Sequence, residues 1–448
     1  MRRHCAGGLG HVGFGLVQRF RMAGAEQFRV RPLANDFVRV YESPDPKNIY
    51  TYSPGIVVLP SGRLVATLDL SGPGIGKLPG PKQTIEHGQE WFGKVFVSDD
   101  QGRTWTHKTD FPFMHARPFL AGQSLYVIGH CNYLCIMRSD DEGETWNKTA
   151  ILTESETWHQ APSNVHYANG NVYLVMERIT AAMNGWPCSV MAPVLMRGKV
   201  SDDLTLRENW TFASELVFRD EIHDDDLNYF GVPFFSAVRG EKVSLTANTT
   251  RWLHPIGWLE TNVVQFTDKD HYFHDPAGRT FHLWARANTH GTGYAAIAKV
   301  VENDDGTMTT SLVKAPSGKT MTFVPCPGGQ MKFHILFDEK QALFWLLSSQ
   351  STDSMTRAEC LPPDRYNLPN GERHRLQLHF SKNCIDWCFA GIVSMTNSPK
   401  EARHYASMAI AGDDLVVLSR SGDERAANAH NGNFISFHRV RDFRGLVY

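Results

Sequence analysis

The octapeptide SDDQGRTW at residues 98–105 recurs as SDDEGETW at residues 139–146, and both copies read S-x-D-x-G-x-T-W. An apolar run precedes each copy, at residues 94–97 and 133–138. Within a tight turn, an Asp side chain accepts hydrogen bonds from backbone N–H groups and a Gly supplies a positive φ angle. Each copy therefore predicts a β-turn that joins two strands, followed by a Trp that returns toward the core.

Two weaker copies of this motif lie further along the chain, at residues 201–210 and 381–387. Their recurrence indicates a fold built from repeated units of strands. The motif resembles the Asp-box of sialidase-like β-propellers, where it fixes a turn far from the reactive groups. We therefore expect these residues to stabilise the fold and not to carry chemistry.

The chain also repeats a longer unit, in which a short apolar strand, a tight turn and a second apolar strand follow one another. The clear copies lie at residues 56–69, 118–130, 162–178, 260–286, 331–348 and 405–420. Residues 216–250 are expected to contain one more copy. Helical periodicity is almost absent, so we predict an all-β, seven-bladed β-propeller, with six blades as the alternative. Its predicted boundaries are an N-terminal extension at 1–36 and a single propeller domain at 37–448.

Composition narrows the class of partner. The chain has 448 residues, 42% of them hydrophobic, and 11 Trp, which suits a large core packed between blades. Its net charge is −2 and it contains no dense run of Lys and Arg, which argues against a nucleic-acid partner. The sequence predicts no membrane span and only a poor signal peptide, so we expect a cytoplasmic protein, with a secreted or periplasmic one as the alternative. The eight Cys show no zinc-type spacing and are expected to be reduced.

Propeller topology converts the repeat into a predicted site. The innermost strand of each blade lines a central channel, so the residues just before it and just after the second strand share one face, opposite the Asp-boxes. Polar side chains occupy these positions along the whole chain. They are Tyr52, Asp69, His115, Arg117, His130, His159, Glu177, Arg178, Glu260, Asn262, Arg286, Gln330, Lys332, Gln350, His404, Tyr405 and Arg420. A funnel rich in cations and imidazoles predicts a site for an acidic sugar.

Phrases in the C-terminal half carry a closer resemblance. They read PGGQMKF at residues 327–333, WLLSSQ at 345–350, RHYAS at 403–407 and SRSGD at 419–423. They resemble a seven-bladed propeller family that acts on the rhamnose caps of arabinogalactan, and the resemblance extends over residues 45–448. That family contains L-rhamnose-α-1,4-D-glucuronate lyases and related α-L-rhamnosidases. The resemblance implies an acidic plant-type glycan as partner and a Ca²⁺ ion in the central funnel, without identifying the ligands of the ion.

A lyase of this kind must neutralise the carboxylate of glucuronate, remove the proton at C5 and protonate the departing oxygen. We expect Arg178, with Arg117 or Lys332, to hold the carboxylate. His159 and His130 are the first candidates for the base and the acid, with His115 and Tyr405 in reserve. Substrate binding is expected from Arg117, Glu260, Asn262, Arg286, Gln330, Lys332, His404, Tyr405 and Arg420.

Three alternatives remain open. A related α-L-rhamnosidase needs a histidine near the end of the first hairpin, where we find Thr67. An exo-sialidase uses an arginine triad, a Tyr/Glu nucleophile pair and an Asp acid, and its first arginine belongs to an R-I-P phrase where this chain reads YSPGI at residues 52–56. A non-catalytic carbohydrate-binding propeller is the third. We rank the lyase above these alternatives because a hydrolase usually needs a pair of carboxylates. The predicted funnel contains few carboxylates.

Overall fold

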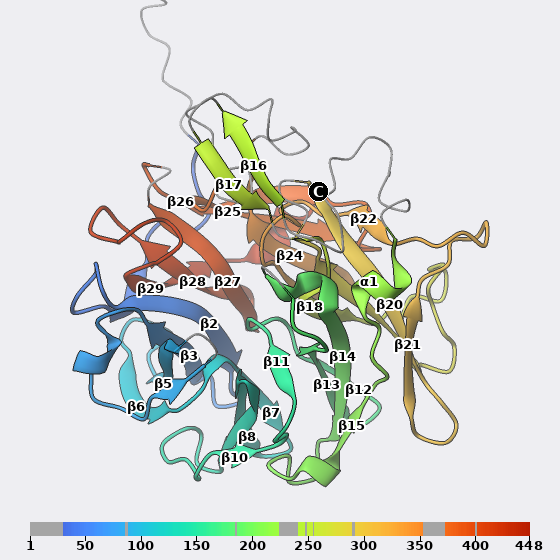
Figure 1. Ribbon diagram of the computed structural model, residues 1–448, viewed down its shortest axis with the longest axis horizontal. Coiled ribbons are helices and arrows are strands. Elements are labelled where there is room, and N and C mark those ends of the chain that lie inside the picture. The colour runs from blue at the N-terminus through green and yellow to red at the C-terminus, as the bar shows by residue number, and fades with distance from the viewer. Residues whose placement is uncertain are drawn as a thin grey trace, which may run out of the picture. The chain divides into compact units, whose positions relative to one another are not determined.

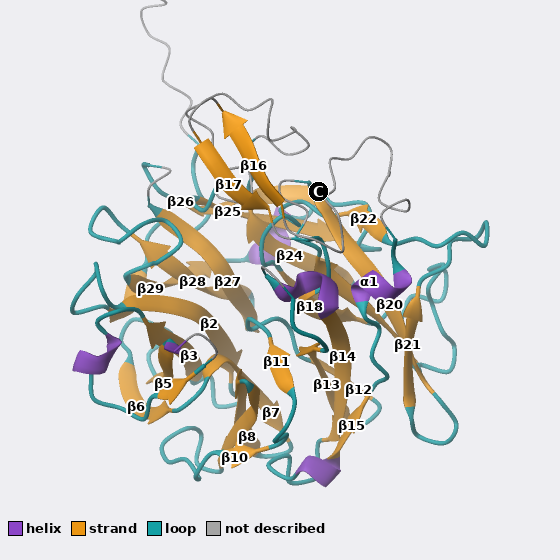
Figure 2. Cartoon of the chain, viewed as in Figure 1, coloured by secondary structure: helices purple, strands orange, loops and turns teal. Residues whose placement is uncertain are grey.

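The computed structural model describes residues 30–85, 88–183, 186–223, 241–246, 249–253, 255–288, 292–352, 372–398 and 401–448. Strands make up most of its regular structure, and the helices are short (Figure 2). Residues Pro32–Tyr448 form one compact unit. Within the described ranges, no helix has the length and apolar character needed to cross a membrane.

Six sheets, which we call blades 1 to 6, follow one another around a central channel in the described part of the chain (Figure 1). Blade 1 consists of β2 (Tyr50–Val58), β3 (Leu64–Ser71), β4 (Gln83–Thr84), β5 (Glu90–Ser98) and β6 (Thr106–Phe111). Blade 2 consists of β7 (Met114–Ala121), β8 (Ser124–Cys131), β9 (Tyr133–Ser139) and β10 (Ala150–Ile151). Blade 3 consists of β11 (Thr157–His159), β12 (His166–Ala168), β13 (Asn171–Ile179), β14 (Met191–Lys199) and β15 (Trp210–Phe212).

Blades 4 to 6 follow the same antiparallel order. Blade 4 consists of β18 (Leu259–Val264), β19 (Thr280–Arg286), β20 (Tyr294–Glu302), β21 (Met308–Leu312) and β22 (Phe323–Pro325). Blade 5 consists of β23 (His334–Asp338), β24 (Leu343–Ser349), β25 (Arg375–Ser381) and β26 (Cys388–Met395). Blade 6 consists of β27 (Ala402–Ala411), β28 (Asp414–Gly422), β29 (Phe434–Val440) and, from the other end of the propeller sequence, β1 (Val38–Glu42). The pairing of β1 with β29 closes the ring, with Val38 opposite Phe437.

The predicted number of seven blades is wrong, and the alternative of six is the one observed. The error comes from residues 216–250, which were expected to hold a further inner hairpin. Their described part contains the short helix α1 (Phe218–Glu221) and the strand β16 (Glu241–Thr246), which pairs only with β17 (Thr249–Leu253) to form a two-stranded sheet. Residues 224–240 lie outside the described residues. All six hairpins predicted from the sequence are inner strands of the blades.

The core lies between the blades. A separate cluster of buried apolar side chains fills each of the six interfaces between neighbouring blades. Between blades 6 and 1, for example, Val416 and Ile435 pack with Leu68 and Phe92. Each blade is apolar on both faces because it is sandwiched between two others, which explains why the strands read as continuous apolar runs.

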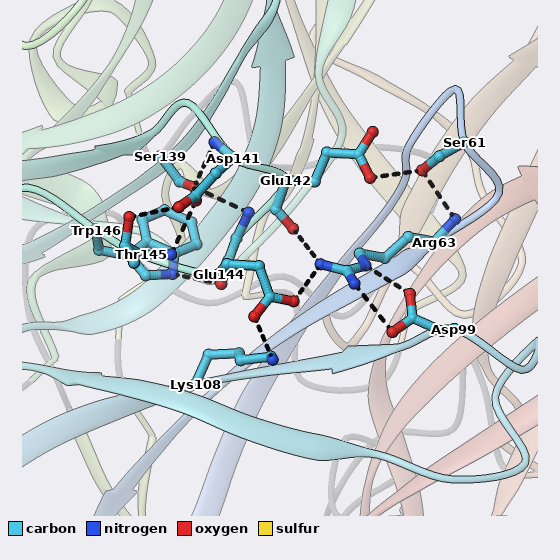
Figure 3. Close-up of polar contacts among 11 residues, drawn as sticks. Ser61, Arg63, Asp99, Lys108, Ser139, Asp141, Glu142, Glu144, Thr145 and Trp146 are labelled. Carbon is cyan, nitrogen blue, oxygen red and sulfur yellow. Dashed lines mark hydrogen bonds and ion pairs between the residues drawn. The ribbon is translucent and has the colours of Figure 1, made fainter.

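Both Asp-boxes form the turn networks expected from their residue types. In the second, the Asp141 carboxylate accepts from the N–H of Thr145 at 2.8 Å, and the N–H of Gly143 donates to Ser139 Oγ at 2.9 Å (Figure 3). Gly143 has φ 87° and Glu142 before it has φ 57°. The Trp146 ring is only partly buried and its Nε1 donates to the Gly143 carbonyl at 3.0 Å. The first box repeats these bonds through Asp100, Ser98 and Gly102.

An arginine beside the turn of the first hairpin links the two Asp-boxes to each other. Arg63 donates to Asp99 of the first box at 2.6 Å and to Glu144 of the second at 2.6 Å (Figure 3). Lys108 also donates to Glu144, at 2.6 Å. The turn of the first hairpin and both Asp-boxes therefore lie on one face of the ring, as the topology predicts.

Candidate active site

The innermost strands of several blades share one irregularity. Their pairing register shifts between Met114 and Arg117 in β7, between Leu259 and Asn262 in β18, and between His404 and Ser407 in β27, with a fourth shift in β2. The first inserted residues of these three bulges are His115, Glu260 and Tyr405, and all have positive φ angles, of 54°, 54° and 49°. Non-glycine residues adopt this conformation at a cost of about 1–3 kcal/mol, and bulges re-aim side chains beside functional sites. The same kind of β-bulge therefore brings three polar side chains to one end of the channel.

Three histidines gather on blades 2 and 3. His115, His130 and His159, which we call the imidazole cluster, have ring centroids 5.2 to 5.3 Å apart. His115 Nδ1 lies 3.2 Å from His130 Nε2, and the backbone N–H of His115 donates to the buried Asp69 carboxylate at 3.1 Å. Trp91 lies edge-on to His115 and Trp186 lies edge-on to His159.

Burial keeps this cluster neutral. It lowers the pKa of His130 to about 3 and that of His159 to about 4, and it lowers the pKa of His115 well below its usual value. Mutual repulsion between the rings acts in the same direction, and the charge of Arg286 adds to the shift at His159. Burial raises the pKa of Asp69 well above its ordinary range.

Three guanidinium groups meet beside Tyr405. Arg286 Nη1 lies 2.7 Å from the Tyr405 hydroxyl and 3.1 Å from Glu260 Oε2. The guanidinium carbons of Arg420 and Arg373 lie 5.2 and 5.7 Å from the centre of the Tyr405 ring. We call Arg286, Arg373 and Arg420 the arginine cluster. Burial raises the pKa of Tyr405 above its usual value, while the positive charge of Arg286 opposes that shift.

The arginine cluster is anchored by neighbouring polar groups. Arg373 Nη1 lies 2.9 Å from His404 Nδ1, and Arg420 Nη2 donates to the carbonyl of His430. The guanidinium carbon of Arg420 lies 4.1 Å from the centre of the Tyr52 ring. Among the described residues, only Glu260 forms an ion pair with the cluster, in which Arg286 and Arg420 are buried and Arg373 is partly buried. Their field favours an anionic ligand.

Several predicted site residues are instead buried in bonds that hold the inner strands together. Arg117 donates to Ser163 Oγ at 3.0 Å and to two carbonyls of blade 3. Asn262 donates to the Phe333 carbonyl at 3.2 Å and accepts from the Ile335 N–H at 3.0 Å. Lys332 donates to Ser407 Oγ at 3.1 Å and to the Ala406 carbonyl, and Gln330 donates to the Ser349 carbonyl. The contacts of Arg117, Asn262 and Lys332 connect neighbouring blades.

Arg178 lies apart from the arginine cluster. Its guanidinium carbon is 5.9 Å from the centre of the Trp158 ring, and its Nε is 3.5 Å from Glu215 Oε1. A cavity of about 310 Å³ lies at the opposite end of the channel, among Val58, Phe119 and Phe337. Neither the imidazole cluster nor the arginine cluster lines this cavity. We therefore locate the candidate site by the charged side chains that converge there, and not by the position of this cavity.

Arg373 is the main site residue that the sequence did not reveal. It lies just before β25 in a segment without a hairpin signal, so the repeat pattern assigned it no place in the funnel. His430 and Asn431 were also missed, and Asn431 Oδ1 accepts from the Tyr52 hydroxyl at 2.9 Å.

The fold is that of the sialidase-like, six-bladed β-propellers. Neither a protein-family model nor a curated protein matches the chain. An intramolecular trans-sialidase from Ruminococcus gnavus, solved with oseltamivir carboxylate, matches with a TM-score of 0.50 at 11% identity over 91% of this chain and 98% of that one. A Dyadobacter fermentans protein of unknown function matches with a TM-score of 0.50 at 10% identity over 90% and 98%. An α-L-arabinanase from Penicillium chrysogenum, solved with arabinobiose, has a TM-score of 0.45 at 11% identity over 93% and 100%. Matches at this level of identity define the fold alone.

Proposed function

We propose that the protein is an enzyme that cleaves an acidic glycan at a sugar bearing a carboxylate. The observation that carries the proposal is the convergence of Arg286, Arg373 and Arg420 around the hydroxyl-bearing ring of Tyr405. Buried arginines bind carboxylates through short, charge-assisted hydrogen bonds. One of the matching structures is named as a trans-sialidase, which makes a glycan the first substrate class to test.

The particular reaction that we propose is β-elimination of terminal L-rhamnose from α-1,4-linked D-glucuronate. The arginine cluster holds and neutralises the glucuronate carboxylate, which makes the C5 proton more acidic. Tyr405 removes that proton as a phenolate, for which its hydroxyl lies 2.7 Å from Arg286 Nη1, a positive charge that opposes the rise in the pKa of Tyr405 caused by burial. The electron pair forms the C4–C5 double bond, the C4–O bond to rhamnose breaks, and the departing oxygen takes the proton held by Tyr405, which gives free rhamnose and returns Tyr405 to its phenolate.

This assignment revises the roles expected from the sequence. Arg178 was expected to hold the carboxylate, but its ion pair with Glu215 favours the arginine cluster for that role. His159 and His130 were expected as base and acid, whereas we assign the base to Tyr405 because its hydroxyl contacts Arg286 of the cluster that would hold the carboxylate. We assign the imidazole cluster a different role, which is to stabilise the departing oxygen by hydrogen bonds. The electrostatic influence of Arg286 on the pKa of His159 supports a single continuous site.

A second candidate is a sialidase-type hydrolase. The contacts among Glu260, Arg286 and Tyr405 favour it, because a carboxylate next to a tyrosine resembles the Tyr/Glu nucleophile pair of exo-sialidases. In that reaction Tyr405 attacks the anomeric carbon and water then hydrolyses the covalent intermediate. The α-L-rhamnosidase alternative gains no support from Thr67, whose buried hydroxyl donates to the Ala116 carbonyl at 2.6 Å.

The decisive experiment incubates the protein with gum arabic and follows free rhamnose together with the ultraviolet absorbance of a 4,5-unsaturated uronate. Rhamnose with new absorbance supports the lyase, and rhamnose without it indicates hydrolysis. Release of sialic acid from a simple sialoside supports the second candidate instead. Binding of the glycan without any product indicates a carbohydrate-binding propeller.

A further inference from the structure

The imidazole cluster has the geometry of a metal site. His115, His130 and His159 each offer a ring nitrogen, and these atoms lie within 4.8 Å of one another. No other group of three His, Cys, Asp or Glu side chains meets this condition among the described residues. The three residues come from β7, β8 and β11, so two neighbouring blades hold them in place.

Hydrogen bonds alone do not satisfy this cluster. Nε2 of His130 lies 3.2 Å from His115 Nδ1 and equally 3.2 Å from both the N–H and the carbonyl of Gln160. One nitrogen cannot serve all three neighbours, because it either donates one proton or accepts through one lone pair. Nδ1 of His130 is buried and has no hydrogen-bond partner among the described residues. Burying polar atoms in this state costs free energy, and a cation bound at Nε2 would offset the part of that cost that arises at this atom.

Asp69 stands behind the cluster as a carboxylate does behind a metal-bound histidine. Its Oδ1 accepts from the backbone N–H of His115, and its Oδ2 lies 3.9 Å from His115 Nε2. Asp69 is fully buried, and Oδ2 has no hydrogen-bond partner among the described residues. With His115 Nδ1 bound to a cation, the ring proton lies on Nε2 and faces Oδ2 of Asp69, which is the side on which a metal-bound histidine has its second partner.

We infer that His115, His130 and His159 bind a divalent transition-metal ion, with Zn²⁺ as the first candidate. Two nitrogens bound tetrahedrally to Zn²⁺ at about 2.0–2.1 Å stand roughly 3.3–3.4 Å apart, close to the 3.2 Å between His115 Nδ1 and His130 Nε2. Each of the three imidazoles offers one ring nitrogen as a ligand. The side chain of His115 is 11% exposed and His159 is 8% exposed, so the cluster lies close to the end of the buried channel wall.

The donor set distinguishes this ion from the calcium implied by the family resemblance. Ca²⁺ takes six to eight oxygen ligands, whereas imidazole nitrogen suits Zn²⁺, Co²⁺ and related ions. The inference goes beyond the proposed glycan cleavage and does not depend on it, because metal binding is measured without a substrate.

The test uses the full chain after removal of metal with a chelator and dialysis. Co²⁺ is added stepwise while its visible absorption is recorded, Zn²⁺ is then used to displace it, and the melting temperature is measured with each ion. We expect saturation at one ion per chain, a visible spectrum of a four-coordinate nitrogen site, and a rise in melting temperature. His159→Phe, which keeps a ring against Trp186, should weaken the binding of both ions by at least about 100-fold.

The control is His107→Phe, because His107 lies on β6, half exposed beside Asp110, and belongs to no cluster of ligands among the described residues. It should bind both ions as the wild type does. Three outcomes would overturn the inference: no saturable binding of Co²⁺ or Zn²⁺ by the folded wild type, equal binding by the wild type and His159→Phe, or stabilisation by Ca²⁺ but by neither transition metal. Circular dichroism of each variant shows whether it is folded, so that metal binding is compared only between folded proteins.

Discussion

The hydroxyl of Tyr405 lies 2.7 Å from Nη1 of Arg286, although the two residues belong to blades 6 and 4, which are not neighbours in the ring. The positive φ of Tyr405 and of Glu260 makes this meeting possible, because each bulge turns its residue toward the other blade. The contact therefore depends on the closed ring and is not a property of either blade alone.

Replacing Tyr405 by Phe tests the chemical role of this hydroxyl. We expect Tyr405→Phe to lower kcat by about 10²–10⁴-fold, the range typical of a lost general base, with little change in KM or melting temperature. Rhamnose release from gum arabic supplies the assay. The matched control is Tyr272→Phe, whose exposed ring lies outside the site and whose loss of a hydroxyl should leave kcat unchanged. A Tyr405→Phe enzyme within about twofold of the wild type would remove Tyr405 from the mechanism.

Arg373 should act mainly on the substrate carboxylate. Loss of a hydrogen bond to a charged group costs about 1.5–3 kcal/mol, so Arg373→Gln should weaken the binding of D-glucuronate by roughly 10- to 100-fold. Calorimetric titration with D-glucuronate, and with D-glucose as the neutral ligand, checks this expectation. Arg63→Gln, on the Asp-box face, is the control and should not change either affinity. Equal weakening for the neutral sugar would mean that Arg373 shapes the site without recognising charge.

Lys332 should make stability depend on pH. Burial lowers its pKa to about 7 from the usual 10.5, so between these values the unfolded chain binds more protons than the folded one. Stability contributed by Lys332 therefore rises with pH across this window and is smallest below about pH 7. Relative to Lys332→Met, the wild type should gain about 2–3 kcal/mol in free energy of unfolding between about pH 7 and about pH 9. Denaturant titrations at both pH values measure the difference, and the exposed Lys269→Met should show no such change.

Gly102 and Gly62 separate two effects of adding a methyl group. Both have nearly the same positive φ, 89° and 88°, but a Cβ on Gly102 would lie 2.2 Å from the Phe437 ring, while one on Gly62 would meet nothing within 4 Å. Gly62→Ala should cost about 1–2 kcal/mol from backbone strain. Gly102→Ala should cost a further ~1–3 kcal/mol because the Asp-box must move away from blade 6. Equal losses in denaturant titrations would contradict the close packing of this turn.

The sequence predicted the strands well because their signals are local. Alternation, tight turns and the paired Asp, Gly and Trp of the Asp-boxes depend on neighbouring residues, and the turns at Asp100 and Asp141 formed as expected. The number of blades was harder to predict, because one two-stranded sheet, β16 with β17, has the same local pattern as the inner hairpin of a blade.

The candidate site was predicted only in part. How far along the channel a given side chain lies depends on the pairing of whole strands and not on neighbouring residues alone. His115 and Arg117 are two residues apart in one strand, yet the bulge between them places His115 in the imidazole cluster and leaves Arg117 bonded to Ser163. Asn262 likewise follows the bulge at Glu260 and bonds to the next blade. A register shift changes which residues face the site, and the sequence carried no signal for where the shifts occur.

The pairing of β1 with β29 also determines how the ring comes apart. Val38 and Phe437 are among the paired residues most distant in sequence, so closing this seam costs the most loop entropy and should occur last during folding. Every other blade is continuous in the chain and keeps its sheet when the ring opens. Separation of β1 leaves the edge of β29 unpaired and uncovers the cluster between blades 6 and 1, a combination that favours association with another chain. The rate at which β1 separates from β29 should therefore set how long the closed propeller persists before it associates with another chain.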